Sequence, residues 1–223
     1  ISKKKGCPAM IGKSMKAIPG LCAAIGAVLL ASGCGLHQSP EKPITYYQLH
    51  YEAPAPSFAG PPLPFVICVD PFHSKNLYSQ QGIVYQDGPH RTDRYAYHQW
   101  ITPLDRMLPH LITRDLQKAG IIRGVFFEGG EAVTHRLVGS IEEFYEADAP
   151  EQWTAVVSVS VTFIDARSTN AAEQIVFQKT YSARRPCTEK TPAAFVEAAS
   201  QAMAGLSEEL TGDIYEALKK EEN

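Results

Sequence analysis

Hydrophobic and polar residues alternate along three long stretches in the second half of the chain, at about residues 134–145, 153–165 and 174–184. Turn-rich segments separate these stretches. In the middle stretch one strand face collects apolar residues and the other collects hydroxyl residues. The apolar face consists of Trp153, Ala155, Val157, Val159, Val161 and Phe163, and the polar face of Thr154, Ser158, Ser160 and Thr162. The pattern predicts an antiparallel meander whose buried face needs a covering layer.

A first amphipathic helix is predicted to begin at Thr102-Pro103 and to stop at Gly120. Thr102 would cap the helix, and proline suits the first turn because its missing N–H has no partner there. Pro109 lies inside the segment. Because an internal proline removes a hydrogen bond and clashes with the preceding turn, the helix either kinks there or begins later.

A second helix is predicted from Thr191-Pro192, where apolar residues recur at spacings of three and four as far as Ala217. The stripe lasts about three heptads, so packing on the sheet is a better explanation than a coiled coil. Both helices can therefore cover the apolar face of the meander.

Four shorter stretches in the first half predict further strands, at residues 46–51, 65–70, 82–88 and 91–97. The second is almost continuously apolar, as expected of a strand covered on both faces. The last two are separated by a short turn and predict a hairpin. We therefore expect an α+β fold: a mixed, largely antiparallel sheet with two long helices packed on it.

The N-terminal part of the sequence has the order of a secretory signal peptide. Two lysines precede an uncharged run over residues 17–36, and Met10 or Met15 would each begin a signal peptide of ordinary length. The strongly apolar part, residues 21–31, is too short for a transmembrane helix, which needs roughly 20 such residues. We expect residues 1–33 to be upstream sequence and a signal peptide that is removed.

Residues 31–34 read Ala-Ser-Gly-Cys, directly after the apolar run. This stretch resembles the lipobox of bacterial lipoproteins, with Ala31 where leucine is usual. The resemblance implies cleavage before Cys34 and acylation of both its thiol and its new amino group, since several acyl chains give lasting attachment where one does not. Gly35 follows the cysteine in place of a retention aspartate, which implies lipid anchoring at the periplasmic face of the outer membrane.

The mature chain would then consist of a lipidated cysteine with a flexible tether, residues 34–43, and one globular domain, residues 44–223. Removing the leader removes five lysines and no acid, which leaves 16 basic and 24 acidic residues and a net charge near −8. Nucleic-acid affinity comes largely from Lys and Arg that neutralise phosphates. A nucleic-acid partner is therefore not expected.

Cys68 and Cys187 are the two cysteines left once Cys34 is lipidated. An even pair in an oxidising compartment is a possible disulfide. Neither residue belongs to a CxxC motif. Cys68 lies in an apolar run where a buried free thiol is the more common outcome, so both alternatives stay open.

Three common motifs of nucleotide-binding or catalytic sites are not matched by the sequence. Residues 6–14 have five residues between their glycines where a phosphate-binding loop has four, and GxSxG and HExxH do not occur. The histidines form no close ligand pair, so neither a zinc site nor a cofactor is expected. Glu142, Glu143 and Glu146 could suggest acid–base chemistry, but a solvated acidic strand face explains them better.

Aromatic residues are concentrated in the predicted strands of the first half, and they include Tyr46, Tyr47, Tyr85, Tyr95, Tyr97 and Trp100. Most are expected in the core. Exposed aromatic patches often mark interfaces. Tyr95, Tyr97 and Trp100 are therefore a possible partner surface.

The order of several short segments resembles one protein family. These segments read YYQL, VICVDPF, LYSQQGIVYQDG, YAYHQW and LQKAGIIRGV, followed by three strands and a terminal helix, all behind the lipobox. Their succession is similar to the ABC-type transport auxiliary lipoproteins, the outer-membrane partners of paraquat-inducible and mammalian-cell-entry (MCE) transport systems. The resemblance covers essentially the whole mature chain.

The resemblance implies a component that is not an enzyme and carries no ATP site. Its partners would be an MCE-domain periplasmic protein and an inner-membrane ABC permease and ATPase, which move lipids or other hydrophobic compounds between membranes. A homo-oligomer is also implied, without a number of copies. The alternative is a lipoprotein that assembles or regulates another envelope machine, in lipopolysaccharide export or in activation of a cell-wall synthase.

Overall fold

The computed structural model describes residues 42–54, 58, 60–74, 77–130, 132–170 and 174–222. They belong to one compact unit, Lys42–Asn223. The signal peptide, Cys34 and nearly all of the tether lie outside the described residues, so those sequence-based expectations stay predictions.

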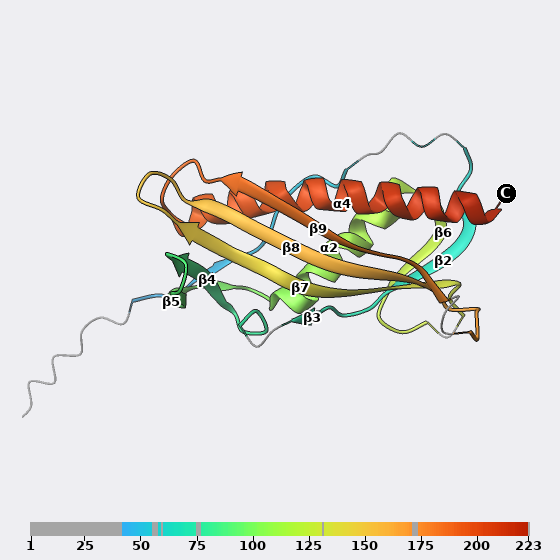
Figure 1. Ribbon diagram of the computed structural model, residues 1–223, viewed down its shortest axis with the longest axis horizontal. Coiled ribbons are helices and arrows are strands. Elements are labelled where there is room, and N and C mark those ends of the chain that lie inside the picture. Colours follow the sequence, from blue (N-terminus) through green and yellow to red (C-terminus); the bar gives the residue numbers. More distant parts are fainter. Residues whose placement is uncertain are drawn as a thin grey trace, which may run out of the picture. The chain divides into compact units, whose positions relative to one another are not determined.

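Within the described residues, nine strands form one mixed sheet (Figure 1). The strands are β1 (Thr45–Tyr47), β2 (Leu63–Val69), β3 (His73–Ser74), β4 (Gly82–Asp87), β5 (Thr92–Trp100), β6 (Ile122–Phe127), β7 (His135–Asp148), β8 (Thr154–Asp165) and β9 (Ile175–Pro186). Six strands follow the order β1-β5-β4-β7-β2-β6, and the long strand β7 also pairs with β8, which in turn pairs with β9. The predicted meander β7-β8-β9 is antiparallel, whereas β2–β6, β2–β7 and β4–β7 are parallel. The mixed α+β fold is confirmed.

Helix α2 spans Leu104–Ala119 and continues through Pro109. The cap prediction for Thr102 is wrong, because the helix begins one residue later and Pro103 precedes it without a side-chain cap bond. Proline at position 109 leaves the carbonyl of Asp105 without its usual helical donor. The N–H of Phe72 donates to this carbonyl at 3.1 Å, so the adjoining chain supplies the bond that the helix lacks. Gly120 ends the helix in the left-handed conformation, as predicted.

Helix α4 spans Pro192–Glu222 and packs along β8 and β9 (Figure 1). The hydroxyl of Thr191 accepts a hydrogen bond from the N–H of Ala194 at 3.2 Å, which confirms the predicted cap. Buried Asp115 of α2 accepts hydrogen bonds from the hydroxyls of Ser207 on α4 at 2.6 Å and Tyr51 at 2.8 Å. This carboxylate joins both helices to the segment that follows β1.

Two short strands were not expected from the sequence. β6 follows directly after the Gly120 stop and pairs in parallel with β2, and β3 pairs with the middle of β7. Both are short and gain their hydrogen bonds from strands distant in the chain, so their local sequence carries little periodic signal. Both strands extend the sheet beside β2 and β7, and α2 packs against them.

Cys68 and Cys187 are both buried and free, so the possible disulfide is not formed. Strand pairing shows how far apart the two cysteines lie along β8. Cys68 is level with Ile164 of β8, through Arg136 of β7. Cys187 directly follows the residue of β9 that pairs with Thr154 of β8. Ten residues of strand, about 33 Å, separate these two positions on β8. A disulfide needs Cα atoms within about 7 Å of each other.

Candidate functional site

The exposed large apolar side chains gather mainly at the β1–β5 edge of the sheet. Ile44, Tyr46, Tyr97 and Ile101 are 44%, 55%, 43% and 56% exposed, respectively. β1 is a three-residue edge strand and pairs only with β5 along the described path. This set of four residues is here called the edge patch, and it contains two of the aromatic residues singled out from the sequence, Tyr46 and Tyr97.

The three residues proposed from the sequence as a partner surface have different environments. Tyr97 is exposed, Tyr95 is half-buried, and Trp100 is only 1% exposed. The Trp100 ring packs edge-to-face on Phe144 with the centroids 5.8 Å apart. The surface role is therefore wrong for Trp100, because its position on β5 points it into the core.

A buried carboxylate lies beneath this end of the sheet. Glu146 has no exposed surface, and the hydroxyl of Tyr95 donates a hydrogen bond to it at 2.6 Å. The pKa of Glu146 is raised to about 8, chiefly by burial; the hydrogen bond from Tyr95 opposes this shift and neighbouring Asp148 adds to it. Burial also raises the pKa of Asp148. The two carboxyl groups therefore hold a proton at a pH where exposed acids have lost theirs.

The assignment of Glu146 to a solvated acidic face is wrong, and a β-bulge explains why. β7 alternates buried and half-buried residues up to Ile141, and its pairing with β8 then shifts between Ile141 and Glu143. A bulge adds one residue and reverses which residues face the core. Phe144 and Glu146 therefore point inward together, and only the adjacent Glu142-Glu143 pair in the sequence hints at the irregularity.

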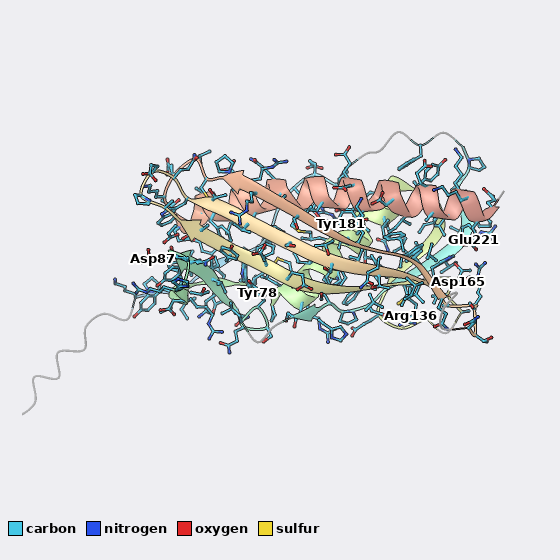
Figure 2. The ribbon with its side chains drawn as sticks, in the orientation of Figure 1. Tyr78, Asp87, Arg136, Asp165, Tyr181 and Glu221 are labelled. Carbon is cyan, nitrogen blue, oxygen red and sulfur yellow. The ribbon has the colours of Figure 1, made fainter. Side chains whose placement is uncertain are left out.

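An ionic cluster lies at the opposite end of the meander, where Figure 2 shows Asp165 and Glu221 close together. Arg167 donates two hydrogen bonds to the Asp165 carboxylate, both at 2.9 Å, and a third to Glu221. The hydrogen bond from Arg167 is the main reason that the pKa of Asp165 falls to about 2. Buried His135 contacts Glu221 through Nε2 at 3.1 Å, and burial lowers the pKa of this histidine.

These groups are the one set of three His, Cys, Asp or Glu residues in the described ranges that could hold a metal ion. One ligand atom from each of His135, Asp165 and Glu221 lies within 4.8 Å of the others. The sequence offered no signal for this set, because its members lie far apart in the chain. The guanidinium of Arg167 already binds both carboxylates, so a metal ion would have to displace it. The cluster fits a structural role in fastening the end of α4 to the sheet.

A groove of about 810 Å³ runs between β9 and the last turns of α4 beside this cluster. Val176, Phe177 and Ala217 form its apolar part, and Lys179 pairs with Asp213 across it at 2.6 Å. Both signs of charge line the groove and largely neutralise each other.

A smaller hollow of about 310 Å³ lies between Ile101 of the edge patch and α2, where Met107 and Leu111 line it. The edge patch and the β9–α4 groove lie toward opposite ends of the meander.

No helix within the described ranges is long and apolar enough to span a membrane.

Comparison with known proteins identifies the fold and the family. The fold is similar to the crystal structure of protein XCC0632 from Xanthomonas campestris, of family DUF330, with a TM-score of 0.70. The two sequences are 18% identical, and the superposition covers 80% of this chain and 99% of XCC0632. A second crystal structure, of an uncharacterised protein, is 16% identical, covers 78% of this chain and 99% of its own, and gives a TM-score of 0.59. No curated protein matches significantly.

A protein-family model described as the ABC-type transport auxiliary lipoprotein component matches residues 47–211. The match runs from the last residue of β1 into the second half of α4, so it covers strands β2 to β9, helix α2 and most of α4. The chain therefore belongs to the family of ABC-type transport auxiliary lipoprotein components.

Proposed function

We propose that this protein is an outer-membrane lipoprotein that serves as the auxiliary, non-enzymatic component of an ABC/MCE-type system for transport between membranes. The family match over residues 47–211 carries the proposal. The cargo would be lipids or other hydrophobic compounds, and the role of this chain would be to dock the periplasmic conduit to the outer membrane.

The anchor in this proposal is Cys34. Its acyl chains hold the chain at the periplasmic face of the outer membrane, since two or more chains give stable attachment. Gly35 follows it and residues 35–43 form the tether. The compact unit from Lys42 onward then lies within reach of both the bilayer and a partner.

The binding surfaces support a docking role. The two carboxyl groups with shifted pKa values already have partners within the protein. Tyr95 donates to Glu146 at one end of the sheet, and Arg167 donates to Asp165 at the other, so both groups contribute to the fold. The edge patch and the β9–α4 groove, in contrast, are open to solvent. Partners would be the MCE-domain periplasmic protein and, through it, the inner-membrane permease and ATPase.

A first experiment tests the anchor. The native protein is purified from envelopes, and the mass of its N-terminal peptide is measured. We expect a triacylated Cys34 at the amino terminus, and the Cys34→Ser variant should leave the outer-membrane fraction. A native protein that begins elsewhere, or a variant that stays equally membrane-bound, contradicts the anchor.

A second experiment tests the partner. The acylated protein is isolated from envelopes in mild detergent after crosslinking, and proteins recovered with it are identified. Recovery of an MCE-domain protein supports transport. Recovery of lipopolysaccharide-export or cell-wall-synthase components without any MCE-domain protein would replace the proposal with the regulatory alternative. An unrelated outer-membrane lipoprotein isolated in the same way is the control.

A further inference from the structure

The exposed apolar side chains of this protein are not scattered. Seven large hydrophobic residues in the described ranges are exposed, and four of them form the edge patch. Single exposed apolar residues are ordinary on a soluble surface, whereas a cluster marks a site of contact. The edge patch therefore needs an occupant.

The pairing of β1 with β5 brings the patch together. Thr45 pairs with His98 and Tyr46 with Gln99, which places Ile44 and Tyr46 beside the stretch that carries Tyr97. Ile101 joins them because its N–H donates to the carbonyl of Tyr47 at 2.8 Å. The four side chains therefore come from two short segments held side by side by backbone hydrogen bonds.

The chain that precedes the patch connects it to the proposed anchor. Eight residue steps separate Cys34 from Lys42, and even a fully extended chain of this length spans at most about 28 Å. Ile44 is two residues further on. If Cys34 carries acyl chains in a bilayer, the edge patch is the part of the described surface that the tether keeps nearest to that bilayer.

The opposite end of the sheet is much farther from the tether. Ile175, another exposed apolar residue, pairs with Ile164 near the end of β8. On the patch side, Gln99 pairs with Gly82 at the start of β4, a level that corresponds to Ser158 of β8. About six residues of strand, roughly 20 Å, and four strand spacings, about 19 Å, separate the two places. Figure 2 shows Asp87 toward one end of the ribbon and Asp165 toward the other. Ile175 is therefore a matched control for the edge patch.

The chemistry of the patch suits a membrane–water interface. Tyrosine is enriched at that depth because its ring is apolar and its hydroxyl stays hydrated, and isoleucine side chains enter the acyl region. The ammonium of Lys42 lies 5.8 Å from the centre of the Tyr97 ring, where it can reach lipid phosphates. The mature chain is acidic overall, so its net charge would not attract it to anionic lipids. The contact would instead be held by insertion of these side chains and by the tether, which keeps the patch close to the bilayer.

We propose that the edge patch, formed by Ile44, Tyr46, Tyr97 and Ile101, rests in the interfacial region of the phospholipid bilayer to which Cys34 is anchored. This inference rests on the proposed lipid anchor and adds the orientation of the domain. It directs β1 and β5 toward the membrane and leaves the β9–α4 groove facing the periplasm, where a conduit would arrive.

Quenching of tryptophan fluorescence by brominated lipids tests the orientation. The acylated protein is reconstituted into phosphatidylethanolamine–phosphatidylglycerol vesicles with brominated acyl chains, with unbrominated vesicles as reference. The variants are Tyr46→Trp and Ile175→Trp, and the signal of the parent protein, which has Trp100 and Trp153, is subtracted. We expect about a twofold loss of the emission from position 46 and almost none from position 175.

Flotation of the vesicles separates the anchor from the patch. If the protein floats but position 46 is not quenched, or if both positions are quenched equally, the orientation is overturned and the anchor stands. If the native protein carries no acyl chains and does not float, both proposals fall. Ile101→Trp is a second reporter if Tyr46→Trp loses the parent thermal stability. An unquenched position 46 whose emission shifts on adding an MCE-domain protein would assign the patch to a protein partner instead.

Discussion

Replacing Glu146 by glutamine should stabilise the protein at neutral and alkaline pH. Glu146 is fully buried, and the Tyr95 hydroxyl donates to its carboxyl group at 2.6 Å. Glutamine has nearly the same shape and keeps an oxygen acceptor for Tyr95. The glutamine amide can donate a hydrogen bond toward Asp148. Its N–H then takes the place of the proton that the Glu146 carboxyl group has to hold at this position.

The magnitude follows from the pKa of Glu146, which is about 8 in the folded protein and 4.5 for an exposed glutamate. Because the pKa of Glu146 is higher in the folded than in the unfolded chain, the contribution of this group to the free energy of unfolding is fully present below about pH 4.5 and is lost as the pH rises through 8. One pKa unit corresponds to about 1.4 kcal/mol, so the loss is on the order of 3–5 kcal/mol. Titration of Asp148, whose pKa is also raised, spreads the change over a wider range.

Urea unfolding between pH 5 and pH 8.5 measures this effect. The parent should lose stability steadily over that interval, and Glu146→Gln should lose much less and be the more stable protein at pH 8.5. Glu143→Gln, at a half-exposed position on the same strand, is the control and should keep the parental pH dependence. The reasoning is refuted if Glu146→Gln keeps the parental pH dependence or is less stable than the parent at pH 8.5.

Three further predictions concern the core. Asp115→Ala should lower the free energy of unfolding by about 3–5 kcal/mol, because two hydroxyl groups and a guanidinium lose their buried partner; urea unfolding measures it. Gly139→Ala should cost about 1–3 kcal/mol in a thermal melt, because its Cβ would lie 2.6 Å from the Phe72 ring. Cys68 and Cys187 should both react with a thiol reagent after unfolding without reductant, and reductant should not change the melting temperature; one or no reactive thiol would contradict the structure.

Much of the fold was predictable because neighbouring residues determine it. The alternation of β8 places Val157, Val161 and Phe163 in the core, as expected from a period of two. The Thr191 cap and the Gly120 stop act through hydrogen bonds and backbone angles within a few residues. Local chemistry of this kind is independent of the rest of the molecule, so the sequence reveals it directly.

The candidate sites were less predictable, because their residues come together from distant segments. The aromatic content of β1 and β5 indicated a surface, but the exposure of Tyr97 and the burial of Trp100 depend on which neighbours cover each ring. The ionic cluster joins His135, Arg167 and Glu221 from three parts of the chain. No spacing in the sequence could indicate that contact.

Local sequence was enough to predict the α+β class, the order of the long elements, the start of both helices and the end of α2 to within a residue or two, and the resemblance to the family, whereas α4 continues five residues beyond its predicted stripe. Tertiary structure alone decided that α2 continues through Pro109, because the Phe72 N–H satisfies the freed carbonyl, and that Glu146 is buried, because a bulge in β7 reverses the facing of its residues. Periodicity and capping act over a few residues, whereas a rescued hydrogen bond or a shifted strand register depends on segments that meet only in the folded chain.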